Sequence, residues 1–274
     1  MSMTATTGFL LHLSGPLQSW GEQSRFNQRD TSRAPTRSGL VGLIAAALGR
    51  PRHEPIDDLA ALRFTIRIDR PGTLLRDFHT VGGGMPRHLT IVTAEGKRRS
   101  ADKATLVSHR YYLQDAAFTV AVTAPDPHLL DRCVQALRAP VWPPYLGRRS
   151  CPPNAPLLIT SLRDDPIRHL VALPLACDPP RDRTREHVSV EFRADTPFTA
   201  ASWPDTPNGH EPEHAYTEAQ DDPISFTPGY RRYRARPIYR RRLDLPVGQC
   251  AGLGTDYLTA LNAHLKELSG KAAS

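Results

Sequence analysis

Residues 8–21 read GFLLHLSGPLQSWG, an apolar run followed by a short polar and aromatic segment. The run from Gly8 to Ser14 predicts a buried strand, which a Gly-Pro pair ends. Gln18, Ser19 and Trp20 then bring together an amide, a hydroxyl and an aromatic face, groups that can hydrogen-bond and stack a single-stranded base. The same residues can instead form a plain turn whose Trp fills the core. Taken alone, the segment slightly favours the plain turn.

The hydrophobic pattern downstream alternates between helix-like and strand-like periods. It predicts, in chain order, a helix at 40–48, strands at 63–69, 74–81 and 111–123, and a helix at 126–138. Thr36 or Ser38 is the expected cap of the first helix, and Gly49 is its C-terminal stop. Residues 63–69 (RFTIRID) alternate with period two, so this strand should be half-exposed. The order of elements fits an α+β fold with a ferredoxin-like core.

A basic insertion interrupts this core between Gly82 and Arg110. Three glycines break the strand that ends at residue 81, and a polar, basic stretch with two short β-like runs follows. Lys103 and Arg110 belong to this stretch. We therefore expect a β-hairpin, inserted in the core, that projects from it.

The C-terminal part contains fewer regular patterns. Strands are expected at 189–193 and 230–245, and a short helix at 256–268. Residues 201–228 hold six acidic side chains and no lysine or arginine, whereas residues 229–243 hold seven arginines and no acid. The acidic stretch should form a mobile surface loop. We expect two domains: a core at 8–160 that carries the insertion 82–110, and a β-rich extension at 161–274 packed on it.

Arginine dominates the charge of the chain. The 274 residues include 35 basic and 28 acidic side chains, which gives a formal net charge of +7. Four of the basic residues are lysine and the other 31 are arginine. The planar guanidinium group suits phosphate and stacks on bases. A GC-rich coding sequence also enriches arginine, so composition favours a nucleic-acid partner without settling the matter.

The sequence predicts neither a metal nor a cofactor. Its cysteines are widely spaced, with no pair at metal-ligand spacing: Cys133, Cys151, Cys177 and Cys250. No secretory segment precedes the first strand, so a disulfide framework is not expected. No apolar run approaches the roughly 18 residues of a membrane span. We expect a cytoplasmic protein with no membrane partner and with reduced thiols.

Three further groups of residues could bind nucleic acid, and each has a plainer explanation. Arg37 and Ser38 stand at the start of the first helix, where free N–H groups attract anions, but an ordinary capped helix looks the same. His79 follows a phenylalanine and could stack or carry protons, although lone histidines are more often structural. Arg148 and Arg149 lie in a proline-rich loop and suit a phosphate backbone, or are simply solvated.

Five blocks, in order, resemble the CasD family, the subunit of the type I-E CRISPR complex Cascade that holds the 5′ handle of the guide RNA. The blocks are GPLQSWG (15–21), PTRSGL (35–40), LRDFHTV (75–81), YLQDAAFTV (112–120) and PYLGRRSC (144–151). The resemblance covers roughly residues 8–160 and is weak beyond them. It implies a ferredoxin-like (RRM-like) RAMP fold with the insertion as a β-hairpin thumb, and additional C-terminal strands.

The resemblance also implies partners and site residues. The partners are the 5′ handle of the crRNA, the CasC backbone subunits, the large subunit CasA and, through the assembled complex, target DNA. The candidate RNA-binding residues come from the resembling blocks, apart from two basic residues of the insertion, Lys103 and Arg110. The full set is Gln18, Ser19, Trp20, Arg37, Ser38, His79, Lys103, Arg110, Arg148 and Arg149. No catalytic residue is expected among them, so the chain is interpreted as a non-catalytic RNA-binding subunit.

Two other functions remain open. In type I-C systems a related subunit cuts the repeat RNA, and His79, Lys103, His109 and Tyr111 could supply acid, base and charge stabilisation for a metal-independent endoribonuclease here. In type I-E systems a separate protein, CasE, makes that cut, so the motifs favour the non-catalytic interpretation. A nucleic-acid-binding protein unrelated to CRISPR is the third hypothesis.

Overall fold

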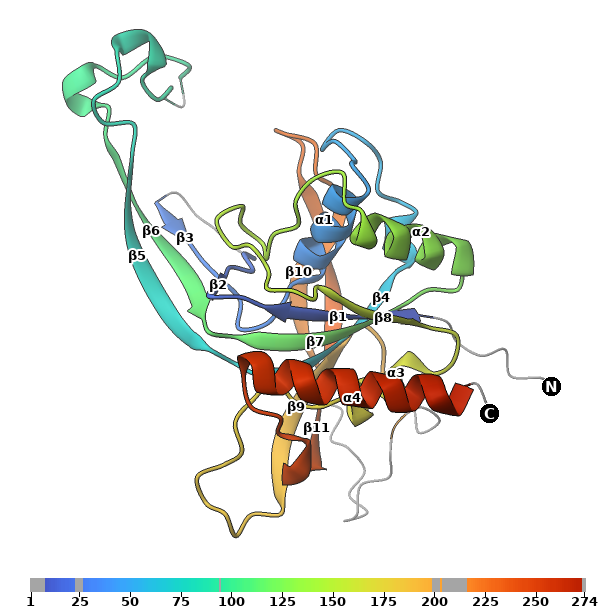
Figure 1. Ribbon diagram of the computed structural model, residues 1–274. Helices are drawn as coiled ribbons and strands as arrows, with labels where there is room; N and C mark the ends of the chain where they lie inside the picture. The colour runs from blue at the N-terminus through green and yellow to red at the C-terminus, as the bar shows by residue number, and fades with distance from the viewer. Residues whose placement is uncertain (1–7, 23–26, 94, 199–202, 204–215, 273–274) are drawn as a thin grey trace.

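A seven-stranded sheet and a smaller sheet beside it organise the computed structural model (Figure 1), which describes residues 8–22, 27–93, 95–198, 203 and 216–272. The strands are β1 (Gly8–Ser14), β2 (Leu17–Gln18), β3 (Gln28–Arg29), β4 (Arg63–Arg70), β5 (Thr73–Val81), β6 (Leu106–Gln114), β7 (Ala117–Thr123), β8 (Leu158–Leu162), β9 (His187–Ala194), β10 (Tyr216–Ser225) and β11 (Arg232–Pro246). The helices are α1 (Arg37–Ala47), α2 (Pro127–Arg138), α3 (Pro166–Ala172) and α4 (Gly254–Ala272). The fold is therefore α+β.

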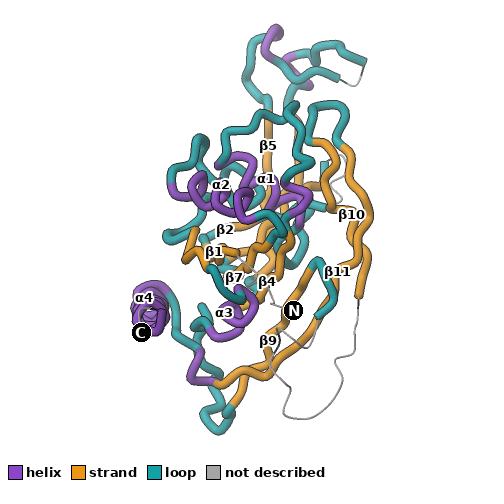
Figure 2. The backbone as a smooth tube through the Cα atoms, turned by 90° about the vertical axis from the view of Figure 1, so that its right-hand side faces the viewer, coloured by secondary structure: helices purple, strands orange, loops and turns teal. Residues whose placement is uncertain are grey.

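The large sheet is antiparallel and runs β10-β11-β9-β4-β7-β1-β8. Helices α1 and α2 lie on one side of it, and α3 and α4 lie on the other (Figure 2). Within it, α1 connects β1 to β4, and α2 connects β7 to β8. The smaller sheet has β6 at its centre, paired with β2, β3 and β5.

The first strand is buried on both faces, which explains its nearly continuous apolar sequence. Phe9, Leu11 and Leu13 pack into the core under α1 and α2. Leu10 faces the second core, which α3 and α4 cover. On this face His12 lies against Tyr257 of α4, with the two ring centroids 4.7 Å apart. Burial lowers the pKa of His12 to about 4, so its imidazole is neutral near pH 7.

The local predictions for α1 and α2 are confirmed. Thr36 caps α1 by accepting a hydrogen bond from the N–H of Gly39, and Gly49 follows the helix with φ +74°. Asp126 caps α2, whose buried face consists of the expected apolar residues. Strands at 189–193 and 230–245 and the C-terminal helix are also present, as β9, β11 and α4. No helix among the described residues is long and apolar enough to cross a membrane.

The prediction that residues 63–69 form a half-exposed strand is wrong. The second face of β4 is buried, because α3, which the sequence pattern did not predict, packs over it. Arg67 and Asp69 lie on this face and form an ion pair, with Nε and Oδ1 2.6 Å apart and both side chains fully buried. Arg67 also donates to the main-chain oxygens of Leu170, Leu173 and Pro174. The polar residues of this alternating pattern therefore belong to a buried ion pair, Arg67–Asp69, and not to a solvent-exposed face.

A single strand at 111–123 is also wrong. The chain turns at Asp115, whose φ is +58°, and this turn separates β6 of the small sheet from β7 of the large one. β6 pairs along its whole length with β5, and this hairpin projects far from the body (Figures 1 and 2). The predicted hairpin between residues 82 and 110 is thus only the outer part of a longer one. Its tip holds two short 3-10 helices. Of the two expected β runs, the first is reduced to a single bridge between Val92 and Arg98, and the second is partly present because Leu106 and Val107 begin β6.

The acidic stretch 201–228 is not a loop over its second part. Residues 216–225 form β10, which pairs with the arginine-rich β11, so the charge complementarity visible in the sequence joins two neighbouring strands. Asp221 is buried and bonds Arg236 through both carboxylate oxygens. The expected loop at 201–202 and 204–215 lies outside the described residues.

Candidate nucleic-acid interface

The segment Gln18–Trp20 after the first strand lies inside the protein and is hydrogen-bonded to the strands around it. The Gln18 amide nitrogen donates to the carbonyls of Leu13 (3.0 Å) and Ala116 (2.9 Å), and its oxygen accepts from the Trp20 indole N–H at 3.0 Å. Gln18 and Trp20 are fully buried. The Trp20 ring packs so closely on Gly39 of α1 that a methyl group at that glycine would lie 2.7 Å from it. Their polar and aromatic groups therefore have partners within the fold, as the plainer interpretation of the segment expects.

Ser19 locks this segment to the proline-rich loop. Its hydroxyl donates to the carbonyl of Tyr111, and its main-chain N–H donates to the carbonyl of Leu146, both at 3.0 Å. Gly147 follows with φ +82°, and a Cβ there would lie 1.7 Å from the Ser19 carbonyl oxygen. Only glycine fits this contact, because it combines the left-handed backbone with the closest approach. The first and last of the five sequence blocks are thus in direct contact.

The two arginines of the loop have different surroundings. Arg148 donates to the carbonyls of Arg29 (2.8 Å) and Tyr111 (3.3 Å), and its guanidinium group stacks 4.7 Å above the Tyr112 ring. It remains partly exposed, while Arg149 is exposed. Arg148 therefore fixes the loop against β6, and Arg149 presents its charge to solvent.

The start of α1 carries an internal anion. The main-chain N–H of Arg37 donates to the Asp221 carboxylate at 2.7 Å. This carboxylate occupies the N-terminus of α1, where the sequence had suggested a phosphate site. The Arg37 side chain is buried and pairs with Asp195 (2.5 Å) and Asp222 (2.7 Å). Burial raises the pKa of Asp195, and the guanidinium groups of Arg236 and Arg37 oppose that rise. Ser38 beside it is half-buried, 3.4 Å from the Thr36 hydroxyl.

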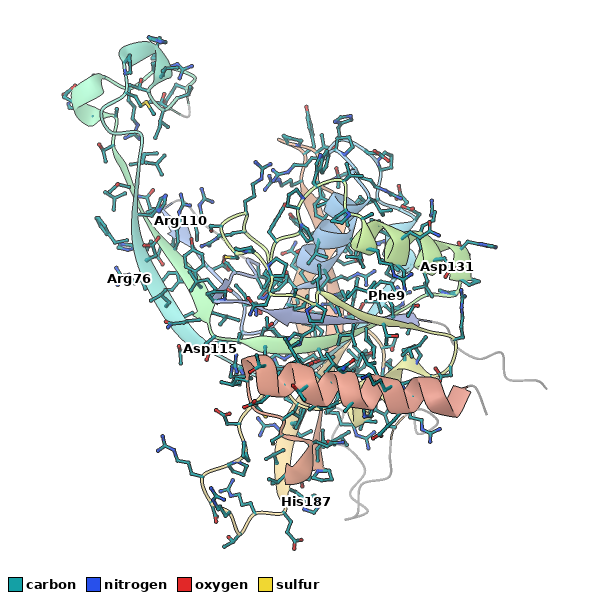
Figure 3. All side chains as sticks on the ribbon, viewed as in Figure 1. Phe9, Arg76, Arg110, Asp115, Asp131 and His187 are labelled. Atoms are coloured by element: carbon teal, nitrogen blue, oxygen red, sulfur yellow. The ribbon has the colours of Figure 1, made fainter. Side chains whose placement is uncertain are left out.

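The β5–β6 hairpin has two chemically different faces, because directly paired residues of a ladder point to the same side. Asp77 pairs with Arg110 and His79 with Ser108, so these four share one face, which continues along β6 to Tyr112. We call this set the inner hairpin face. It is the side on which Arg148 stacks. Figure 3 shows Arg110 on the hairpin stem, and Arg29 reaches the same region because β3 pairs with residues 109–110.

The opposite side, which we call the outer hairpin face, combines Arg76, Phe78, His109 and Tyr111. Arg76 is hydrogen-bonded to His109, with Nε 3.2 Å from Nδ1, and the Phe78 ring lies 5.8 Å from the His109 ring. Phe78 is 65% exposed. His79 on the inner face lies 3.4 Å from the Asp77 carboxylate. Lys103 is exposed and lies in the hairpin tip, away from both histidines along the strands.

Comparison with known proteins identifies the family. The family described as "CRISPR-associated protein (Cas_Cas5)" matches residues 8–239, which is most of the chain. The chain belongs to the Cas5 family of CRISPR-associated proteins. Over 181 residues it is 37% identical to the "CRISPR system Cascade subunit CasD" of Escherichia coli (strain K12), which covers 59% of this chain and 75% of that protein.

Two solved structures share the Cas5 chain's fold. One, described as "CRISPR RNA-guided surveillance complex", contains a chain with 43% identity and a TM-score of 0.79, covering 94% of this chain and 99% of that one. The other, "Crystal structure of Cas protein", has 30% identity and a TM-score of 0.56, covering 90% of this chain and 98% of that one. The likeness to the first structure extends well past residue 160, where the sequence blocks end.

In this Cas5 chain the ten candidate RNA-binding residues separate by exposure. Gln18, Ser19, Trp20 and Arg37 are buried, and Ser38 is half-buried. Lys103 and Arg149 are exposed, whereas His79, Arg110 and Arg148 are half-buried like Ser38 but have long or ring side chains that reach solvent in part. Sequence reasoning missed Arg29, which lies beside Arg148. Arg29 lies beside Arg148 because β3 pairs with β6 in parallel. No local sequence pattern predicts that pairing.

Proposed function

We propose that this Cas5 chain is the non-catalytic subunit of a type I-E Cascade complex that binds the 5′ handle of the crRNA and caps the filament of CasC backbone subunits. CasA and, through the assembled complex, target DNA are its other partners. Membership of the family supports this function, as does the gathering of Arg29, Arg110 and Arg148 at the inner hairpin face, with the exposed Arg149 next to Arg148 in the loop. The last of these observations carries the proposal, because a phosphate backbone needs accessible guanidinium groups.

The core of such a subunit is a ferredoxin-like, RRM-like unit. The strand order β8-β1-β7-β4, with helices α1 and α2 as the two connections on one face, supports this assignment. In the proposed division of labour, the buried Gln18, Trp20 and Arg37 set the shape of the RNA-binding surface. Contact with the handle then falls to the exposed cations.

Replacing Arg148 and Arg149 together with alanine should weaken binding of handle RNA by about tenfold. The slope of log K against log salt should fall by roughly one to two, because up to two phosphate contacts disappear. Titrations of a labelled handle RNA at several salt concentrations measure both quantities. Arg149→Ala alone separates the effects, since Arg148 also holds the loop in place.

Arg163→Ala serves as the matched control, because this arginine is exposed and pairs only with Asp131 among the ion pairs of the described residues. Its slope should equal that of the unaltered protein. An unchanged slope in the double variant would show that the loop is not a phosphate site.

The rival endoribonuclease function finds little support in the geometry. The four candidate catalytic residues do not converge as a set: His79 lies on the opposite face of the hairpin from His109 and Tyr111, and Lys103 lies in its tip. The His109 ring is also engaged by Arg76 on the outer hairpin face. Incubation of the purified protein with repeat RNA, without metal, should leave the RNA intact. Specific cleavage that His79→Ala or His109→Ala abolishes would establish the enzyme instead.

We further propose that the β5–β6 hairpin is the thumb that docks on a CasC subunit. Its tip exposes the apolar side chains of Met85, Leu89 and Val92, which suit a protein partner. Replacing residues 83–104 by an Asn-Gly turn should leave a folded protein that no longer co-purifies with CasC, because the β5–β6 ladder outside the tip is kept. Circular dichroism checks the fold. Normal co-purification of the shortened protein would refute the docking role.

A further inference from the structure

Two cysteines that are distant in the sequence lie side by side. Cys177 follows α3 and Cys250 precedes α4, and their Sγ atoms are 3.7 Å apart. Both are partly exposed, whereas Cys133 and Cys151 are buried. A disulfide needs its sulfur atoms at about 2 Å, so these two atoms must approach by a further ~1.7 Å to form one.

The backbone holds this pair in place. Leu175 donates to the carbonyl of Gln249 (2.7 Å), Ala251 donates to that of Leu175 (3.0 Å), and Gly252 donates to that of Cys177 (3.0 Å). The first two of these bonds form an isolated parallel bridge between Leu175 and Cys250, and the third extends the contact to Cys177. The proximity of the sulfur atoms is therefore set by main-chain pairing.

The segment that carries Cys177 is itself fixed to the body. The buried Arg67 donates to the carbonyls of Leu173 and Pro174, and the Asp69 carboxylate accepts from the N–H of Ala176 at 3.2 Å. Cys250, in contrast, leads through two glycines with positive φ, Gly252 and Gly254, into α4. A bond between the two sulfur atoms would join a rigid part of the molecule to the root of its C-terminal helix.

We propose that Cys177 and Cys250 form an oxidisable dithiol, a modification site at which hydrogen peroxide or a small-molecule disulfide produces an intrachain disulfide that ties α4 to the body. With peroxide, the Cys250 thiolate attacks one oxygen, the O–O bond breaks, and a sulfenic acid and one water result. The Cys177 sulfur then displaces the hydroxyl as a second water. Two thiols lose two protons and two electrons, and one peroxide is reduced to two waters. With a small-molecule disulfide, the Cys250 thiolate forms a mixed disulfide and releases one thiol, and the Cys177 sulfur then displaces the second thiol, so one disulfide is reduced to two thiols.

The surroundings of the two sulfur atoms favour Cys250 as the first to react. The two sulfur atoms lie at hydrogen-bonding distance, and the S–H of Cys177 is placed to donate to the sulfur of Cys250. Burial raises the pKa of Cys177 to about 12, so this thiol stays protonated while Cys250 reacts. Burial also raises the pKa of Cys250, which lowers its thiolate fraction and slows its reaction with an oxidant.

The test uses the full-length folded protein, exposed to hydrogen peroxide in one sample and to oxidised glutathione in another. Intact mass should fall by about 2 Da, and trypsin under non-reducing conditions should release the peptide 169–181 linked to the peptide 243–266. The melting temperature should rise by about 5 °C, because the bond closes a long loop in the unfolded chain. Dithiothreitol should reverse both changes.

Cys177→Ser and Cys250→Ser should each abolish the cross-link and the rise in melting temperature. The double variant Cys133→Ala/Cys151→Ala is the matched control and should retain both, since it keeps the proposed pair and removes the other thiols. Four free thiols after oxidation would overturn the proposal. So would a stable glutathione adduct or sulfinic acid on Cys250 in the unaltered protein, because both show that Cys177 does not resolve the intermediate.

Discussion

Arg67→Met is expected to lower the free energy of unfolding by about 3–5 kcal/mol, since it leaves the Asp69 carboxylate buried without its cation. Both side chains of the pair are fully buried. The substitution also removes donors from the main-chain oxygens of Leu170, Leu173 and Pro174, so the end of α3 loses its attachment to β4. Chemical denaturation followed by circular dichroism measures the change.

Arg163→Met gives the matched comparison for this prediction. Its guanidinium group pairs with Asp131 at 3.0 Å, but 71% of its side chain is exposed. Exposed ion pairs contribute about 0–1 kcal/mol, so this variant should be close to the unaltered protein in stability. A loss below 1 kcal/mol for Arg67→Met would mean that water enters and solvates Asp69, and would disprove the tight packing of α3.

Gly147→Ala should destabilise the protein by about 3 kcal/mol and reduce handle binding at least tenfold. The left-handed backbone at φ +82° disfavours any side chain, and the added Cβ would collide with the Ser19 carbonyl oxygen. The hydrogen bond from Ser19 to Leu146 must break to relieve the collision, which moves Arg148 and Arg149 out of position. Denaturation and RNA titration measure the two effects.

Gly229→Ala measures how much of the destabilisation comes from the left-handed backbone alone, without a collision. Its φ of +80° is nearly the same, and nothing lies within 4 Å of the Cβ that the substitution adds. This variant should lose about 1 kcal/mol and keep its affinity for the handle. Equal losses in the two variants would show that the contact between the loop and Ser19 does not matter.

Local sequence patterns correctly predicted the helices and strands whose apolar residues alone show which face is buried. The amphipathic period of α2, the Asp126 cap and the apolar run of β1 were sufficient, because each describes interactions within a few residues. The position of β10 and the burial of β4 could not be predicted this way. Both depend on elements over a hundred residues away along the chain, such as α1 beside β10 and α3 over β4.

The candidate site shows the same limit. The sequence identified the loop with Arg148 and Arg149 and the hairpin with His79 and Arg110, because runs of charge and aromatic residues are visible locally. It could not tell that Arg37 points inward, since its partners Asp195 and Asp222 lie more than 150 residues away. The sequence shows an arginine but does not show whether its guanidinium group faces a phosphate or a buried carboxylate.

The order of strands in the large sheet has a consequence for synthesis. β4 pairs with β7 on one edge and with β9 on the other, and β9 in turn pairs with β11 near the C-terminus. Until residues 187–194 have been made, β4 has an open edge on the side where β9 later pairs. The large sheet is therefore completed late in synthesis, when β9 and β11 emerge, and until then the unpaired edge of β4 can pair with other strands.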